Sequence, residues 1–320
     1  MTIPIVYTDR HFLHNPSYEI YDGVKTPYAE KAERLTSIMA ALKKAGYKNI
    51  QEPRKFPLDL ITQMHQKQYI SFLQKRSESL KKNESLHPSY FITDTYAPIT
   101  NGTHDAAVSA VDVVLTAAEL VQNGEPAVYA VCRPPGHHAE YKSMGGYCYF
   151  NNAAIAAEYL SKKGSVAILD IDYHHGNGTQ SAFYDRSDVL YVSIHADPAN
   201  AYPYISGFVD EQGVREGRGF NKNYPLPLGT NNSQYAEVLN KALADVHEFN
   251  PKYLVVSAGF DTYQHDPICG FRLTIPFYET MARAIAGLKL PTLIVQEGGY
   301  NVKDLGEIAV SFLKGFQKSE

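Results

Sequence analysis

The sequence predicts an α/β fold in which one open, mostly parallel sheet is covered by helices on both faces. Three observations predict it. Short and nearly continuous apolar runs recur along the chain, as expected of strands buried on both faces. Segments with a helical spacing of apolar residues separate these runs. Residues that can carry chemistry follow the ends of several runs, which is where open parallel sheets bind their ligands.

Six apolar runs are predicted to be strands, and six amphipathic segments are predicted to be helices. This alternation is the rhythm of βαβ units in a parallel sheet. The stretch 197–232, which is rich in glycine and proline, is expected to be a long functional loop. The expected strands are 3–7, 126–131, 165–171, 188–195, 253–260 and 291–297, and the expected helices are 28–45, 103–122, 151–162, 233–248, 275–289 and 303–316.

The composition is that of an ordinary globular protein. Of the 320 residues, 44% are hydrophobic and 20% are charged, and no repeat or linker divides the chain. We expect one domain over 1–320. The net charge of −4 and the lack of a lysine or arginine block argue against nucleic acid as a partner.

The chain start and the cysteines predict where the protein resides. The first residues show no basic segment followed by an apolar stretch, and no apolar run approaches the ~20 residues that span a bilayer. The three cysteines lack the spacing of a metal site, so reduced thiols are expected. We therefore expect a cytoplasmic protein that has no membrane partner.

The stretch ILDIDYHHGNG, 168–178, places acidic and imidazole groups at the end of a predicted strand. Asp170, Asp172 and His174 share one parity, so an extended segment points them to one side. Asp261 ends another predicted strand, and buried carboxylates need a cation or a proton partner. Asp172, His174 and Asp261 are therefore candidate ligands of zinc, iron(II) or manganese. A solvated strand end is the alternative for the first stretch alone.

The motif CRPPGHHAE, 132–140, follows another predicted strand and carries two adjacent histidines. Because neighbouring side chains diverge, His137 and His138 cannot easily bind one metal. They can handle protons if a partner orients each ring. Asp170 and Asn177 are the candidate partners.

Two further motifs place tyrosines beside glycines. In MGGYCYFNNAA, 144–154, the glycines allow a close backbone approach, and Tyr147 and Tyr149 are candidate walls of a pocket. In EGGY, 297–300, two glycines allow the phenol of Tyr300 to be aimed at a metal. A phenol there can donate to an oxyanion that develops on a carbonyl.

Together, the motifs RPPGHHA, GGYCYFNNAA, DIDYHHGNGTQ, VSIHADP, AGFD and EGGY, in this order and spacing, resemble the zinc-dependent histone deacetylase superfamily. The stretches HFLHNPSYEIYDG, DTYQHDPICGFRLT and EGGYNVKDLGEIAVSFLKGF further resemble bacterial acetylpolyamine amidohydrolases. The resemblance covers almost the whole chain. It implies the arginase–deacetylase fold, one Zn²⁺ per chain, structural K⁺, and hydrolysis of acetylated primary amines to acetate and free amine. It is also compatible with a homo-oligomer.

The resemblance implies a role for each motif residue. His138 corresponds to the general base and acid, His137 to its electrostatic partner, and Tyr300 to the group that polarises the carbonyl. Asp170 stands behind His137, and Asn177 stands where relatives carry an aspartate or an asparagine. The implied zinc ligands are Asp172, His174 and Asp261; the implied tunnel walls are Tyr147 and Tyr202, beside Gly146; and the implied potassium sites are Asp170, Asp172, His174, Ser193 and Ile194, and Phe183, Arg186, Val189 and Phe220.

Two departures from the family pattern concern the substrate. Acetylpolyamine amidohydrolases carry an insertion that narrows the entrance, and the segment 88–103 is too short to hold it. Ile268 stands at the gatekeeper position, where polyamine-selective eukaryotic relatives have a glutamate. Within the short segment, Asp94 is the candidate contact of a distal ammonium group, and an ordinary loop aspartate is the alternative.

An N-acetylpolyamine is the expected substrate, and acetyl-lysine in a protein is the alternative. A binuclear manganese ureohydrolase shares the fold, but it needs further carboxylates that 175–177 and 262–263 do not supply. A non-catalytic protein that binds acylated amines would be expected to lack a metal ligand or a proton-handling residue, and none is missing.

Overall fold

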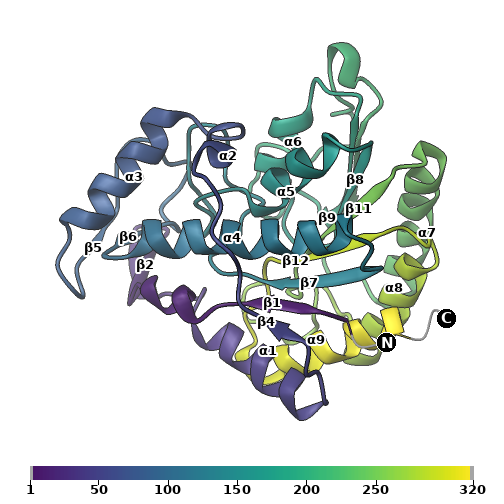
Figure 1. The fold of residues 1–320 in the computed structure, drawn as a ribbon, viewed down its shortest axis with the longest axis horizontal. Coiled ribbons are helices and arrows are strands. Elements are labelled where there is room, and N and C mark those ends of the chain that lie inside the picture. The colour runs from purple at the N-terminus through teal and green to yellow at the C-terminus, as the bar shows by residue number, and fades with distance from the viewer. Residues whose placement is uncertain (1–2, 318–320) are drawn as a thin grey trace.

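The computed structural model describes residues 3–317, and its centre is an eight-stranded sheet (Figure 1). Its strands are β1 (Ile5–Tyr7), β4 (Ile50–Gln51), β7 (Ala127–Val131), β8 (Val166–Asp170), β9 (Val189–Ala196), β10 (Asn221–Leu226), β11 (Tyr253–Ala258) and β12 (Thr292–Gln296). They lie in the order β10-β9-β8-β11-β12-β7-β1-β4, and all neighbouring pairs are parallel. The predicted α/β fold is confirmed. Residues 1–2 and 318–320 of the predicted domain lie outside the described residues.

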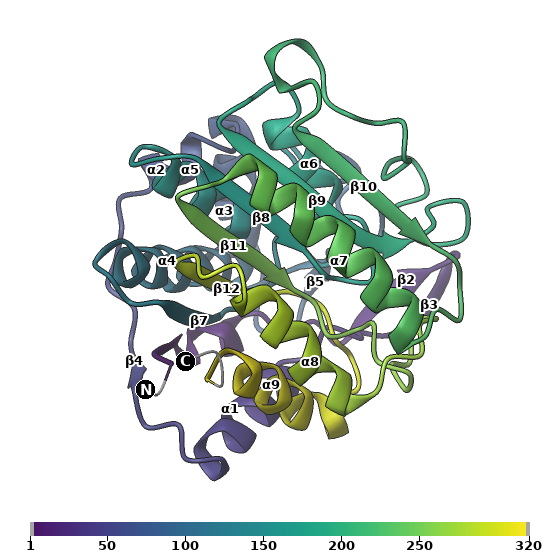
Figure 2. The same ribbon diagram turned by 90° about the vertical axis from the view of Figure 1, so that its right-hand side faces the viewer.

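Helices cover both faces of the sheet. The helices α1 (Glu33–Lys44), α7 (Asn232–Phe249), α8 (Ile275–Ala286) and α9 (Val302–Gln317) pack on the face that is turned to the viewer in Figure 2. The helices α4 (Thr103–Gln122), α5 (Asn152–Ser161) and α6 (Asn177–Phe183) pack on the other face. Alternate residues of one strand enter the two cores: Ala167 and Leu169 of β8 join the first, and Val166 and Ile168 join the second. This double burial explains why the strands read as continuous apolar runs.

The predicted strands and helices are present with shifted ends, but the sequence missed several elements. The prediction that 197–232 is loop throughout was wrong, because β10 lies within it. Asn221 and Asn223 of β10 are buried polar side chains, so the strand carries no apolar run. The helices α2 (Asp59–Thr62) and α3 (Lys67–Ser79), the 3-10 turns Asp9–Leu13 and Arg215–Gly217, and the pair β5 (Ser85–Leu86) and β6 (Ile99–Thr100) were also not predicted.

A small hairpin near the amino terminus forms a separate two-stranded sheet. Its strands are β2 (Tyr18–Tyr21) and β3 (Val24–Pro27). Asp22 and Gly23 join them with φ angles of 47° and 78°, as a two-residue turn between antiparallel strands requires. The hydroxyl of Thr95 donates to the carbonyl of Ile20, which ties the segment 88–103 to this hairpin. Both pieces therefore lie together beside the main sheet.

No helix among residues 3–317 is long and apolar enough to cross a membrane.

Candidate active site

The chemistry-bearing residues predicted from the sequence gather at the carboxyl ends of four neighbouring strands. The tandem histidines follow β7, the segment 170–174 begins at the last residue of β8, Asp261 follows β11, and Tyr300 follows β12. These strands are adjacent in the sheet, in the order β8-β11-β12-β7. Because parallel strands end at the same edge, residues far apart in the sequence meet there.

The three candidate metal ligands converge. Nδ1 of His174 lies 3.3 Å from Oδ1 of Asp172 and 3.1 Å from Oδ2 of Asp261. Both carboxylates are fully buried. A Cβ atom on Gly298 would lie 2.4 Å from Oδ2 of Asp261 and 2.6 Å from Oδ2 of Asp172, so this glycine leaves room for both oxygens. The geometry forms a cradle of one nitrogen and two carboxylates.

The charge of this cradle calls for a cation. Burial, together with the charge of Asp172, raises the pKa of Asp261 to about 7. Two adjacent buried carboxylates are stable when a positive charge compensates them. A donor set of one imidazole and two carboxylates, with room for water, suits a catalytic zinc. Asp172, His174 and Asp261 therefore fit Zn²⁺.

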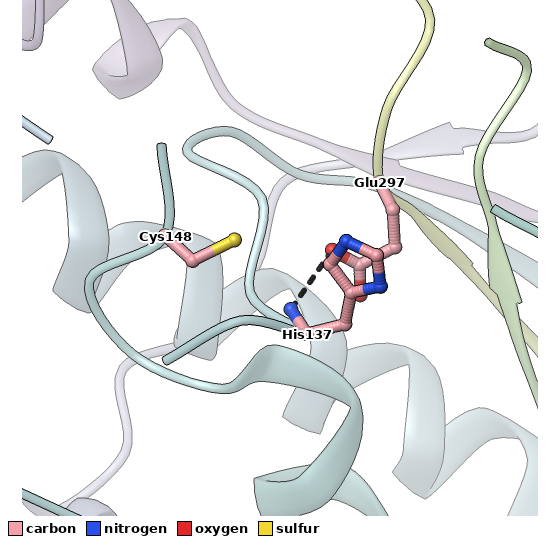
Figure 3. Close-up of side chains that lie close together, drawn as sticks. All are labelled: His137, Cys148 and Glu297. Carbon is pink, nitrogen blue, oxygen red and sulfur yellow. Dashed lines mark hydrogen bonds between the residues drawn. The ribbon is translucent and has the colours of Figure 1, made fainter. Parts of the chain in front are cut away.

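Two further groups of potential ligand atoms lie close together. One joins Sγ of Cys269 to His174 and Asp261, with all ligand atoms within 4.8 Å of one another. The other comprises His137, Cys148 and Glu297 (Figure 3).

The atoms of the second group already have partners. Oε2 of Glu297 accepts from the backbone N–H of Gly136 at 2.6 Å and from that of His137 at 3.3 Å. The thiol of Cys148 donates to the carbonyl of Gly146. Glu297 therefore fixes the loop that carries the tandem histidines, a contact that the sequence did not predict although EGGY contains the residue. Burial raises the pKa of Glu297 to about 7.

The two histidines have different surroundings. Nδ1 of His137 lies 3.1 Å from Oδ2 of Asp170, and Nδ1 of His138 lies 2.8 Å from Oδ1 of Asn177. Burial disfavours the imidazolium of His137, but the charges of Asp172 and Asp170 outweigh it and raise its pKa to about 10. Burial and the charge of His137 hold the pKa of His138 well below its usual value. A charged and a neutral imidazole thus stand side by side, with ring centroids 3.9 Å apart.

Tyr300 keeps its phenolic proton. Burial raises the pKa of this phenol well above its usual value. Arg34 donates to the carbonyls of Glu297 and Gly299, each at 2.5 Å, and its guanidinium lies 5.0 Å from the ring centroid of Tyr300. Arg34 thus holds the EGGY turn and the tyrosine that follows it. A protonated phenol at this place can donate a hydrogen bond to a developing oxyanion.

A pocket of about 230 Å³ opens over these groups. Tyr202 forms one wall, 4.8 Å from the ring of His138, and Tyr147 forms another, 5.5 Å from the ring of Tyr300. Gly146 has a φ of 51°, and a Cβ there would lie 2.4 Å from Cδ2 of His138, so only glycine fits. The lining residues are Glu19, Tyr21, Tyr96, His138, Gly146, Tyr147, Tyr173, His174, Asn200, Ala201, Tyr202, Tyr204, Ile268 and Tyr300.

Two residues behave differently from the sequence-based expectation. Tyr149 does not line the pocket; it is fully buried, and its hydroxyl donates to the carbonyl of Pro98. Asp94 lies behind the wall, where its carboxylate accepts from the hydroxyl of Tyr202 at 2.6 Å and from the backbone N–H of Gly146 at 2.8 Å. Asp94 therefore holds the wall, and its contact with a substrate stays a prediction.

Glu19 is the acidic residue that lines the pocket, and the sequence reasoning missed it. It lies on β2 and is 5% exposed. Its carboxylate accepts from the hydroxyl of Tyr147 at 3.2 Å and from the backbone N–H of Ala29 at 3.4 Å. Burial raises its pKa. The Asp22-Gly23 turn in SYEIYDGVKTP was the available signal, because it predicts a hairpin that carries Glu19.

The residues of the implied potassium sites lie around the ends of β8, α6 and β9. Asp170 of β8 is the register partner of Ser193 of β9. In the second set, the carbonyl of Phe183 accepts from the backbone N–H of Arg186, and that of Phe220 accepts from the backbone N–H of Tyr191. Potassium at either place stays a prediction.

Comparisons with known proteins agree with this geometry. A model of the histone deacetylase domain matches residues 28–316. The chain is 41% identical to acetylpolyamine amidohydrolase 2 of Pseudomonas aeruginosa, covering 98% of each chain, and 38% identical to the acetylpolyamine amidohydrolase of Mycoplana ramosa, covering 97% of this chain and 98% of that one. The crystal structure of acetylpolyamine aminohydrolase from Burkholderia pseudomallei superposes with a TM-score of 0.95 at 37% identity, over 99% of each chain. The chain therefore belongs to the histone deacetylase family.

Proposed function

We propose that this chain hydrolyses N-acetylpolyamines, which are acetylated primary amines with a distal ammonium group, to acetate and the free amine. Its similarity to acetylpolyamine amidohydrolases of Pseudomonas aeruginosa, Mycoplana ramosa and Burkholderia pseudomallei supports an amidohydrolase of this kind. The arrangement of a metal cradle, a neutral imidazole and a protonated phenol around one pocket supports the same reaction. The buried carboxylate of Glu19 in the pocket lining supports the substrate class.

In the proposed hydrolysis, each group of the site has a distinct chemical role. Bound zinc would supply Lewis acidity for the amide carbonyl and for the attacking water. His138 is neutral, so it takes the proton of the attacking water and later gives it to the leaving amine. His137, held as a cation by Asp170, stabilises the negative charge that builds up beside it. Tyr300 donates its phenolic proton in a hydrogen bond to the developing oxyanion.

The position of Glu19 is the observation that carries the choice of substrate. A buried carboxylate in the wall of a pocket is unfavourable unless it is paired, and burial raises its pKa. An ammonium group on the substrate would pair with it. A neutral alkyl tail would leave the carboxylate with its two hydrogen bonds, from Tyr147 and Ala29, but without a cationic partner. The pocket therefore favours a cationic acetylated amine.

Acetyl-lysine in a protein is the competing substrate, and acetate release separates the two. The zinc-loaded protein is assayed with N-acetylputrescine, N-acetylspermidine, an acetyl-lysine peptide and neutral N-pentylacetamide. We expect the two polyamines to give the highest kcat/KM. A higher kcat/KM for the peptide would identify a protein deacetylase instead. No acetate from any substrate would contradict the proposed function as a whole.

Three wider predictions accompany this proposal. A cytoplasmic location is supported by the unpaired thiols of Cys132, Cys148 and Cys269, because reducing compartments keep cysteines in this form. A homo-oligomer stays a prediction, and light scattering of the purified protein measures it. We also propose that the chain is one domain, since both cores share the same sheet.

A further inference from the structure

We propose that Glu140 is a positioning residue, which sets the tautomer of His138 by fixing the orientation of the Asn177 amide. The inference rests on the proposed function, in which His138 transfers the proton. It concerns a residue that lies outside the pocket and was given no role by the sequence.

A chain of hydrogen bonds connects the three side chains. Nδ1 of His138 lies 2.8 Å from Oδ1 of Asn177. On the other side of the amide, Nδ2 of Asn177 donates to Oε1 of Glu140 at 3.0 Å. The same Nδ2 also lies 3.4 Å from the backbone carbonyl of His138. Both acceptors therefore favour the amide orientation in which Nδ2 of Asn177 faces them and Oδ1 faces His138.

The orientation of this amide decides which ring nitrogen of His138 holds the proton. With Oδ1 facing the ring, Nδ1 must donate, and Nε2 keeps a lone pair that can accept a proton. With the amide reversed, Nδ2 would donate to Nδ1. The neutral ring would then carry its proton on Nε2 and could not act as a base there. An asparagine permits both arrangements, whereas an aspartate would permit only the first.

The orientation of the Asn177 amide depends on the acceptors that reach its amino group. Asn177 and Glu140 both line a second cavity of about 490 Å³, together with residues of α6 and of the segment 205–215. Water in such a cavity can donate or accept, so it would satisfy the amide in either orientation. A carboxylate oxygen only accepts. Glu140, at 3.0 Å, therefore supplies the discrimination that water lacks, and the more distant carbonyl of His138, at 3.4 Å, acts in the same sense.

Backbone contacts hold the segments at both ends of this series of hydrogen bonds. The N–H of Glu140 donates to the carbonyl of Ser143 at 2.9 Å, and Nδ1 of His65 lies 2.9 Å from the carbonyl of Glu140. The loop that carries His137 and His138 packs closely against the start of α6. A Cβ on Gly178 would lie only 2.2 Å from the carbonyl oxygen of Ala139. The backbone on either side of the contact between Glu140 and Asn177 is thus held in place.

The first experiment compares Glu140→Ala and Glu140→Gln with the parent protein, using N-acetylputrescine. We expect Glu140→Ala to lower kcat about 10-fold, as loss of an outer hydrogen-bond partner does, with unchanged KM and zinc content. Glu140→Gln can still offer an oxygen to Asn177 and should lose less. Asp185→Ala is the matched control, because Asp185 lines the same cavity. A Glu140→Ala protein with the kcat of the parent overturns the proposal.

A double-mutant cycle separates positioning from a general structural effect. Aspartate at position 177 presents oxygens only and needs no selector, and its charge would oppose that of Glu140. We expect Glu140→Ala to lower kcat in the parent and to leave it unchanged or raise it in the Asn177→Asp protein. Equal losses in both backgrounds overturn the proposal.

A spectroscopic readout tests the tautomer without turnover. In ¹⁵N-histidine-labelled protein, with and without zinc, NMR distinguishes a protonated Nδ1 from a protonated Nε2, and His138→Gln identifies the signal of His138. We expect Nδ1–H in the parent and a mixture in Glu140→Ala. A parent that shows Nε2–H, or a variant with the parent's tautomer, overturns the proposal. If the parent releases no acetate, the proposed function fails, while the NMR result still decides the role of Glu140.

Discussion

Nδ1 of His174 lies 3.1 Å from Oδ2 of Asp261, although 87 residues separate the two in the sequence. The contact exists because β8 and β11 are neighbours in a parallel sheet and end at the same edge. A hydrogen bond and a metal bond would use the same Nδ1 atom. The pair is therefore an electrostatic contact and, in the proposed assignment, two of the three metal ligands.

The first prediction concerns this ligand set. Asp172→Ala, His174→Ala or Asp261→Ala should each lose zinc and acetate release, because two remaining ligands hold the ion weakly. Metal analysis of the purified variants measures the loss. Cys269→Ala is the control and should keep one zinc per chain, although its sulfur lies near His174 and Asp261. Loss of zinc from the Cys269 variant, or its retention by the others, would show that the ligands are assigned incorrectly.

The second prediction is that Tyr300→Phe keeps its zinc but loses rate. Removing one donor to an oxyanion costs on the order of 10²–10³ in kcat. The ring would stay in its place between Arg34 and Tyr147, so the thermal unfolding midpoint should change little. Steady-state kinetics with N-acetylputrescine provide the test. A kcat near that of the parent would place the phenol away from the reacting carbonyl.

The third prediction compares the two acidic residues near the pocket. Glu19→Gln should lower kcat/KM about tenfold for N-acetylputrescine but little for N-pentylacetamide, because a hydrogen bond to a charged group is worth ~1.5–3 kcal/mol. Asp94→Asn should affect both substrates equally, since Asp94 supports Tyr202 and Gly146. If Asp94→Asn weakened only the cationic substrate, Asp94 would be the specificity residue, as the sequence suggested.

The fourth prediction links pH to stability through His65. Burial lowers the pKa of His65 from 6.5 to about 4. Between these values the unfolded chain binds the proton and the folded chain does not. The contribution of His65 to the free energy of unfolding is therefore fully present above pH 6.5 and is lost as the pH falls toward 4. The loss is on the order of 3 kcal/mol for this group.

Replacement of His65 measures this loss. The free energy of unfolding in urea, followed from about pH 7.5 to about pH 5, should decline more steeply for the parent than for His65→Gln. Glutamine can still accept from the backbone N–H of Asn151 and donate to the carbonyl of Glu140, the two contacts that His65 makes. Identical slopes would mean that His65 takes up its proton over the same pH range in the folded and the unfolded protein, which would contradict the lowered pKa.

The sequence predicted well those features that depend on local pattern. The apolar runs of β7, β8, β11 and β12 identify the strands, and the polar residues that directly follow them identify the edge where the site lies. For this reason, the sequence alone was enough to predict that Asp172, His174 and Asp261 lie together. Their roles as ligands stay predictions until metal is measured.

Features that depend on packing between distant segments could not be predicted from the sequence. Glu19 enters the pocket only because the β2–β3 hairpin folds beside Tyr147, which lies 128 residues away. Glu140 stands in the motif CRPPGHHAE, 132–140, but its contact with Asn177 arises from the approach of α6. The strand β10 was hidden because its buried side chains Asn221 and Asn223 are polar. In each case the decisive partner is remote in the sequence.

Under the proposed function, the β2–β3 hairpin carries the residue that selects the substrate, and the strand ends of the central sheet carry the catalytic groups. The family model begins at residue 28, after the hairpin, whereas Glu19 lies on β2. The hairpin forms its own sheet, outside the hydrogen-bonding of the central one. The hairpin could therefore be exchanged as a unit. Replacing it with the corresponding hairpin of a relative that prefers another substrate should change the substrate selectivity and leave the metal cradle and the tandem histidines unchanged.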